Sequence, residues 1–120
     1  MFTLGSTNAY HLYRPACDMR KSFDGLCGLV DSELGRDPTG GEVFIFINRR
    51  RTHIKLLHWQ SGGFVLYYKR LEKGTFPLPK MSPDQTRVSW PDLVLMIEGI
   101  RVERARQLPR YRMAKNGEKT

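Results

Sequence analysis

The sequence has few cysteines and no long apolar run. Its two cysteines, Cys17 and Cys27, form no CxxC pair, so neither a disulfide framework nor a zinc ribbon is expected. No stretch approaches the about 18 apolar residues of a membrane span. The start, Met1-Phe2-Thr3-Leu4-Gly5, lacks the charged and apolar regions of a signal peptide. We therefore expect a cytoplasmic protein with no membrane contact.

Patterns typical of catalytic sites are also missing. Gly40-Gly41 is not followed by the Lys-Ser/Thr of a phosphate-binding loop, and neither Ser6 nor Ser22 has an evident base nearby in the sequence. His53 and His58 are five residues apart on an expected strand, so they point to opposite faces and cannot share a zinc ion. The sequence therefore predicts no enzyme, no catalytic residues, no metal and no cofactor. A nuclease that holds Mg²⁺ with Asp18 and Asp24 is the weakest alternative, because these carboxylates do not share a helical face.

Acidic residues are scarce relative to basic ones. Twelve Asp and Glu face twenty Lys and Arg in 120 residues, which gives a net charge of +8. Seven of the bases and only two of the acids follow Ile100, so residues 101–120 carry +5. We predict one domain over residues 1–100 and a basic, flexible tail over residues 101–120. The tail arginines expected to contact phosphates are Arg101, Arg104, Arg106, Arg110 and Arg112.

The remaining pattern predicts an α+β fold. Apolar residues at helical spacing predict one main helix over about residues 18–34, with Asp18 as N-cap and Gly35 after its end. Pro91 suits the first turn of a short helix over about residues 91–98. Strands are expected over 43–47, 53–59 and 64–71, with short additions at 9–14 and 87–89. We expect an antiparallel sheet of three to five strands, with the main helix packed on it.

The turn Gln60-Ser61-Gly62-Gly63 fixes which side chains of the hairpin share a face. Lys55 should lie with Tyr68, and Leu57 with Leu66. If the turn after Ile47 has an even number of residues, side chains on the other face of the hairpin lie on the same face of the sheet as Ile47 and the alternate residues of the 43–47 strand. The first face alternates aromatic and basic residues, so two interpretations stay open: it stacks single-stranded nucleic acid, or a helix covers it as core. Its members are His53, Lys55, Leu57, Trp59, Phe64, Leu66, Tyr68 and Arg70.

Five sequence blocks in this order and spacing resemble one family over roughly residues 10–100. They are 18–26 (DMRKSFDGL), 43–51 (VFIFINRRR), 55–59 (KLLHW), 68–76 (YKRLEKGTF) and 95–100 (LMIEGI). The family is the small accessory protein encoded by the second reading frame of bacterial insertion sequences of the sixty-six group, often labelled TnpB. The resemblance implies a bacterial protein with an accessory role in transposition, beside a separate transposase. One departure is the Gln60–Gly63 turn, which replaces an acidic one.

These observations lead to a functional hypothesis. Three adjacent arginines at a hairpin turn suit the approach of a polyanion. We expect a non-enzymatic factor that binds DNA at the element ends, through Arg49, Arg50, Arg51, Lys55, Lys69 and Arg70. The alternative is an adaptor that docks on the transposase or on another accessory protein of the element without binding DNA. An exposed strand edge would also be compatible with a dimer.

Overall fold

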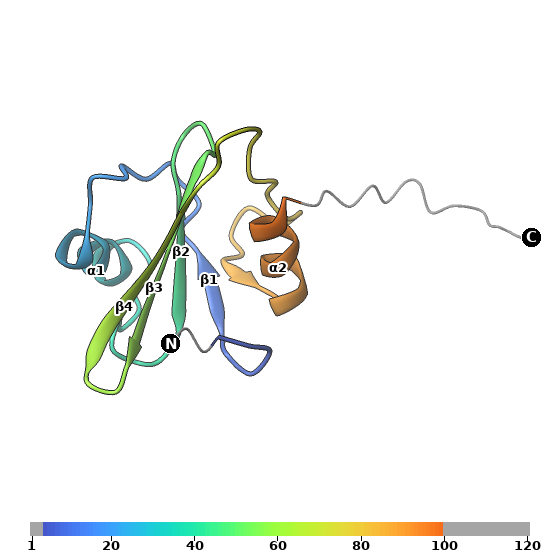
Figure 1. Ribbon diagram of the computed structural model, residues 1–120. Coiled ribbons are helices and arrows are strands. Elements are labelled where there is room, and N and C mark those ends of the chain that lie inside the picture. The colour runs from blue at the N-terminus through green and yellow to red at the C-terminus, as the bar shows by residue number, and fades with distance from the viewer. Residues whose placement is uncertain (1–3, 100–120) are drawn as a thin grey trace, which may run out of the picture.

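The computed structural model describes residues 4–99. Within them the chain forms β1 (Tyr10–Leu12), α1 (Phe23–Ser32), β2 (Val43–Ile47), β3 (His53–Gln60), β4 (Gly63–Arg70), β5 (Arg87–Val88) and α2 (Trp90–Glu98). The strands form one sheet with the order β4-β3-β2-β1-β5. Figure 1 shows this sheet between the two helices, with α1 on one side and α2 on the other. The α+β prediction is confirmed, as are the short strands expected near residues 9–14 and 87–89.

The sheet is mixed rather than purely antiparallel. Tyr10 pairs with Val43 and Leu12 with Ile45 in a parallel ladder between β1 and β2, while the other neighbours are antiparallel. A parallel pair needs a long crossover connection, and here α1 lies within it. The expectation of an antiparallel sheet was wrong for this one pair because it ignored the helix between the two strands.

The main helix is shorter than residues 18–34. It begins at Phe23, with Ser22 rather than Asp18 at its N-cap, and it ends at Ser32. Asp18 instead closes a turn, because its carboxylate accepts from the Arg20 backbone N–H at 2.9 Å. The predicted role of Gly35 after the end of the helix is confirmed. Gly35 has a φ of 63°, and the backbone N–H that follows it, on Arg36, donates to the Val30 carbonyl at 3.1 Å.

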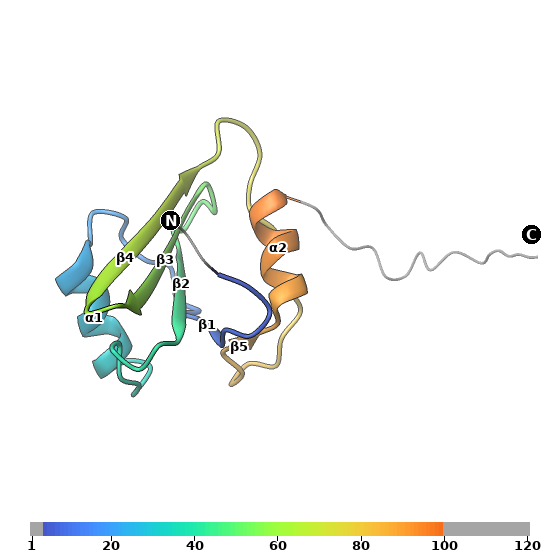
Figure 2. The same cartoon turned by 60° about the horizontal axis from the view of Figure 1, so that its bottom comes forward.

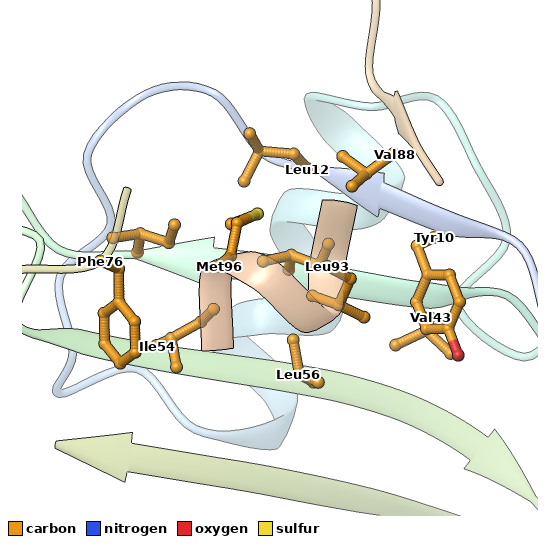
Figure 3. Close-up of a cluster of buried hydrophobic side chains, with 11 residues drawn as sticks. Tyr10, Leu12, Val43, Ile54, Leu56, Phe76, Val88, Leu93 and Met96 are labelled. Atoms are coloured by element: carbon orange, nitrogen blue, oxygen red, sulfur yellow. The ribbon is translucent and has the colours of Figure 1, made fainter. Parts of the chain in front are cut away.

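Each face of the sheet has its own hydrophobic core. The α1 face buries Leu26 and Val30 of the helix against Phe44, Phe46 and Leu57. On the opposite face, Leu93 and Met96 of α2 pack on the sheet (Figure 3). Their neighbours there include Tyr10, Leu12, Val43, Ile54, Leu56, Phe76 and Val88. Figure 2 shows again that the helices lie on opposite sides of the strands. The unbroken apolar run of β2 is thereby explained, since both of its faces are covered.

The hairpin register is as predicted. Lys55 is opposite Tyr68, and Leu57 is opposite Leu66. Ser61 and Gly62 form the tip, with φ values of 52° and 79°, as in a type I′ turn. Ile47 pairs with Ile54, so the intervening turn has an even number of residues. As expected, alternate residues of β2 and one face of the hairpin therefore lie together on the α2 face of the sheet. These positions decide which hairpin side chains face a helix.

The second helix has the predicted bounds to within one residue. The Ser89 hydroxyl accepts from the Asp92 backbone N–H at 3.2 Å, which satisfies one free donor of the first turn. Pro91 lies in that turn, and Gly99 ends the helix with a φ of 78°. In the part of the chain from residue 4 to residue 99, no helix is long and apolar enough to span a membrane.

Candidate nucleic-acid interface

The arginine turn, residues Asn48–Thr52, connects β2 to β3. The Asn48 side-chain oxygen accepts from the backbone N–H groups of Thr52 at 2.9 Å and His53 at 3.0 Å. Arg51 has a φ of 60°, which is unusual for a residue other than glycine. Its N–H donates to the Asn48 carbonyl at 3.0 Å, and its carbonyl accepts from Phe76 N–H at 2.7 Å. The backbone is thus held on both sides, so the turn presents its side chains from a defined position.

The three side chains themselves extend from this turn into solvent. Arg49, Arg50 and Arg51 are all exposed. Within residues 4–99, none of their guanidinium groups forms a hydrogen bond or an ion pair. Three like charges in adjacent positions repel one another, and no carboxylate among the described residues forms an ion pair with them. An anion that reached this turn would meet unoccupied donors.

Other basic residues gather at the same end of the sheet, which is the upper end in Figure 1. The Cys17 N–H donates to the carbonyl of Ile47, just before the turn, and this places the loop with Arg20 and Lys21 there. The Leu71 N–H donates to the Thr52 carbonyl, which brings the Glu72–Gly74 turn to the same end. The three connections at this end and the residues next to them carry the basic residues Arg14, Arg20, Lys21, Arg49, Arg50, Arg51, Arg70 and Lys73 and the acidic residues Asp18, Asp24 and Glu72.

The opposite end of the sheet has a different charge balance. The Gln60–Gly63 turn carries no charge, and the connector into β2 has Glu33, Asp37 and Glu42 against Arg36 alone. Two of these charges neutralise each other, since the Arg36 guanidinium donates to both Glu42 carboxylate oxygens at 2.8 Å. The charge of the described residues is therefore polarised along the strands, with the basic end at the arginine turn.

Lys55 does not belong to the exposed basic surface. Only 5% of this residue is exposed. Its ammonium group donates to the carbonyls of Met19 and Lys21, both at 2.8 Å. It also lies 4.6 Å from the centre of the Tyr68 ring. These contacts hold the loop that leads into α1, so the ammonium group is already engaged within the fold.

Lys69 and Arg70 are also engaged with other groups of the chain. The Lys69 ammonium donates to the carbonyl of Ile97 at 2.9 Å, near the C-terminal end of α2. Arg70 forms an ion pair with Glu72 at 2.7 Å, and both side chains are largely exposed. Exposed ion pairs of this kind contribute little to stability, so the Arg70 guanidinium can exchange its partner. The structure thus separates the predicted contacts into three free arginines, one exchangeable arginine and two internal lysines.

The predicted tail contacts lie outside the described residues. Arg101, Arg104, Arg106, Arg110 and Arg112 all follow residue 99. Their role in phosphate binding therefore stays a prediction from composition. The predicted flexible tail of residues 101–120 likewise lies outside the described residues and stays a prediction.

The aromatic face of the hairpin is shared between core and surface. Phe64 and Leu66 are half-buried and pack against the core under α1. The Trp59 and Phe64 rings meet edge to face, with centroids 4.9 Å apart. Tyr68, in contrast, is 52% exposed. The interpretation as core therefore holds for the end near Gly63, while Tyr68 remains available to a ligand.

The residues considered for metal or thiol chemistry have other contacts. The Asp18 carboxylate is paired with Arg20, and this guanidinium holds the pKa of Asp18 well below its usual range. In the described range no group of three His, Cys, Asp or Glu side chains could hold a metal ion. Cys17 is buried, and burial raises the pKa of its thiol, so this residue packs as a small hydrophobic side chain.

A buried polar cluster escaped the sequence analysis. His11 on β1 is 5% exposed. Its Nδ1 lies 2.9 Å from the Thr86 hydroxyl, and its Nε2 lies 3.2 Å from a Glu42 carboxylate oxygen. Since a carboxylate only accepts, Nε2 carries the proton and Nδ1 accepts from the hydroxyl. Burial, followed by the charge of Arg36, lowers the His11 pKa. No local pattern could have revealed this cluster, because its partners are far apart in the sequence.

Comparison with known proteins identifies the chain. The family model described as IS66 Orf2 like protein, TnpB_IS66, matches residues 8–107. Two similar proteins are uncharacterized proteins of Sinorhizobium fredii. One, y4jC, is 31% identical over 98 residues, with 82% of this chain and 84% of the relative covered. The other, y4hO, is 32% identical over 84 residues, with 69% and 72% covered. No solved structure matches significantly. The chain belongs to the IS66 Orf2-like family, which supports an accessory role in transposition and is not a known class of enzyme.

Proposed function

We propose that this protein assists the transposition of an insertion sequence by binding nucleic acid through its arginine turn, without catalysing a reaction. One observation carries the proposal: Arg49, Arg50 and Arg51 are exposed and unpaired within residues 4–99, on a turn whose backbone is fixed. Phosphate contacts need guanidinium groups that are free in solvent and held in position. The DNA at the element ends is the partner that this role implies.

The charge distribution supports a single approach direction for the polyanion. The basic end gathers residues from three connections, including Arg20 and Lys73. The far end has a neutral turn and the acidic residues of the connector into β2. A charged ligand is steered toward the positive end of such a molecule. Lys55 and Lys69 are not part of the proposed contact set because their ammonium groups bind backbone carbonyls.

The adaptor alternative is favoured by a different feature, the open edge of the sheet. β4 is a terminal strand of eight residues without proline, and only β3 pairs with it in the described chain. Such an edge can accept a strand from another protein. The transposase, another accessory protein of the element or a second copy of this chain are the candidate partners.

A salt titration of DNA binding tests the proposal. The wild-type protein should lose affinity linearly with the logarithm of salt concentration. Replacement of Arg49, Arg50 and Arg51 by glutamine should flatten this slope by up to about three units. The matched control removes the same formal charge from exposed positions outside the arginine turn, by glutamine at Arg14, Lys80 and Arg87.

The outcomes separate the hypotheses. A slope that falls only in the arginine-turn variant supports the proposed interface. Equal flattening in both variants would show that binding depends on net charge and not on the turn. No DNA binding at low salt, together with a stable complex with the transposase, would favour the adaptor and overturn the proposal.

A further inference from the structure

Tyr68 is an aromatic side chain at the uncovered part of the hairpin. It lies on the α1 face of β4, opposite Lys55. Phe64 and Leu66 lie on the same face nearer to Gly63, and both pack against the core under α1. Tyr68 is 52% exposed and is the most exposed of the three large hydrophobic residues that are exposed in the described range. The helix therefore covers one end of this face and leaves the other open.

The Tyr68 ring lies against a buried cation. The Lys55 ammonium is 4.6 Å from the ring centroid and is itself fixed by the Met19 and Lys21 carbonyls. The His53 ring lies 5.9 Å away, at an interplanar angle of 39°. A cation over a ring face is attracted to its π electrons and favours one ring orientation. Since half of the residue is exposed, the ring presents a fixed apolar surface to solvent.

This surface lies beside the proposed phosphate contacts. Tyr68 precedes Arg70 by two positions, and Arg70 is opposite His53 at the start of β3. Lys55, which faces Tyr68, follows Arg51 by four residues. At about 3.3 Å per residue, the ring and the turn are within roughly 15 Å along the strand. A ligand that extends over a few nucleotides can reach both.

We propose that Tyr68 stacks on an unpaired base, so that the ligand of the arginine turn is single-stranded nucleic acid. This proposal rests on the proposed function and adds the class of ligand. In a duplex both faces of each base are already stacked, whereas an unpaired base can use an exposed aromatic ring on a sheet. The Lys55 charge behind the ring adds attraction toward the neighbouring phosphates. Tyr68 thereby distinguishes single strands from duplexes, while the arginines contribute affinity for both.

The experiment measures binding to three probes of equal length: a thymidine homopolymer, a uridine homopolymer and a DNA duplex. Tyr68→Ala should weaken binding to single strands about 5- to 100-fold, the range for loss of one stacked base. Binding to the duplex should not change. Tyr68→Phe keeps the ring and should retain wild-type affinity. Leu78→Ala removes another exposed apolar side chain, one that lies beyond the hairpin, and serves as the matched control.

A second readout reports stacking directly. A single strand with one 2-aminopurine should lose fluorescence when it binds the wild-type protein and the Tyr68→Phe variant, because stacking quenches this base. The quenching should disappear with Tyr68→Ala. Comparison of the thymidine and uridine probes shows whether the protein prefers a DNA or an RNA single strand. The circular dichroism spectrum of each variant confirms that the fold is intact.

The failures are distinguishable. If no probe binds at low salt, the proposed function itself is wrong. If the glutamine triple variant loses binding but Tyr68→Ala binds every probe as the wild type does, the arginine turn stands and the stacking role is refuted. Equal weakening of single strands and duplex by Tyr68→Ala would also refute it, since the ring would then not discriminate between them.

Discussion

The β3–β4 hairpin and the turn that precedes it use their basic residues in opposite ways. Lys55 and Lys69 lie within strands, and each holds a segment that belongs to a different layer. Lys55 faces the side of α1, and Lys69 faces the side of α2. The arginines of the turn lie outside any strand, and within residues 4–99 their guanidinium groups form no hydrogen bond or ion pair. A basic residue within a covered strand hydrogen-bonds to a segment of the neighbouring layer, whereas a basic residue beyond the strand end stays available to a ligand.

Replacement of Lys55 by methionine should have the largest effect on stability. The variant loses two charge-assisted hydrogen bonds and leaves the Met19 and Lys21 carbonyls without their donor. We expect the free energy of unfolding to fall by about 2–4 kcal/mol, measured by urea denaturation. The glutamine triple variant of the arginine turn is the contrasting control, because exposed substitutions usually change stability by less than about 0.5 kcal/mol.

DNA binding by the same pair of variants should show the reverse pattern. At temperatures where Lys55→Met is folded, its salt slope should match the wild type, since the ammonium group makes no phosphate contact. A folded Lys55→Met protein with a flattened slope and unchanged stability would contradict the distinction between internal and available bases.

Much of this arrangement could be predicted from the sequence, and the reason is periodicity. The alternation in β3 and β4 predicts Lys55 beside Tyr68 and Leu57 beside Leu66, and the structure has these same pairs. Ser89, Pro91 and Gly99 likewise fix the bounds of α2 through local chemistry. These signals depend on residues close together in the sequence, so the sequence alone predicts them.

The partners of the polar groups could not be predicted in the same way. Lys55 reaches carbonyls 34 and 36 residues earlier in the chain, and His11 reaches Thr86 across 75 residues. Backbone carbonyls carry no sequence signal because every residue has one. The start of α1 was misplaced for a related reason: Asp18 can close a turn as readily as it caps a helix, and only tertiary contacts decide.

Replacement of Lys69 by methionine should also lower the free energy of unfolding, but by less than replacement of Lys55. Its ammonium group donates to one carbonyl, that of Ile97, close to the end of α2. Loss of one charge-assisted bond should cost about 1–2 kcal/mol, again by urea denaturation. Hydrogen exchange should locate the loss in the last turn of α2 and leave the loop before α1 unchanged. Exchange that increases near α1 instead would mean that the two lysines do not serve separate layers.

The smallest effect should come from His11, a buried base that stays neutral. Its imidazole faces the Glu42 carboxylate, the Thr86 hydroxyl and the charges of Arg36 and Arg87. Burial is the largest cause that lowers the His11 pKa below its ordinary value of 6.5. The unfolded chain therefore binds a proton more readily than the folded protein, so the contribution of His11 is present above pH 6.5 and is lost as the pH falls through the folded pKa.

The measurement compares the free energy of unfolding of the wild type and His11→Gln as the pH is lowered from 8 toward 5. Glutamine can still donate to Glu42 and accept from Thr86, but it does not titrate. The wild type should lose more stability than the variant over this range, and the two curves should converge as the pH falls. Curves that stay parallel would mean that His11 is as easily protonated in the fold as in the unfolded chain. The contrast between a neutral buried imidazole and the hydrogen-bonded ammonium group of Lys55 would then disappear.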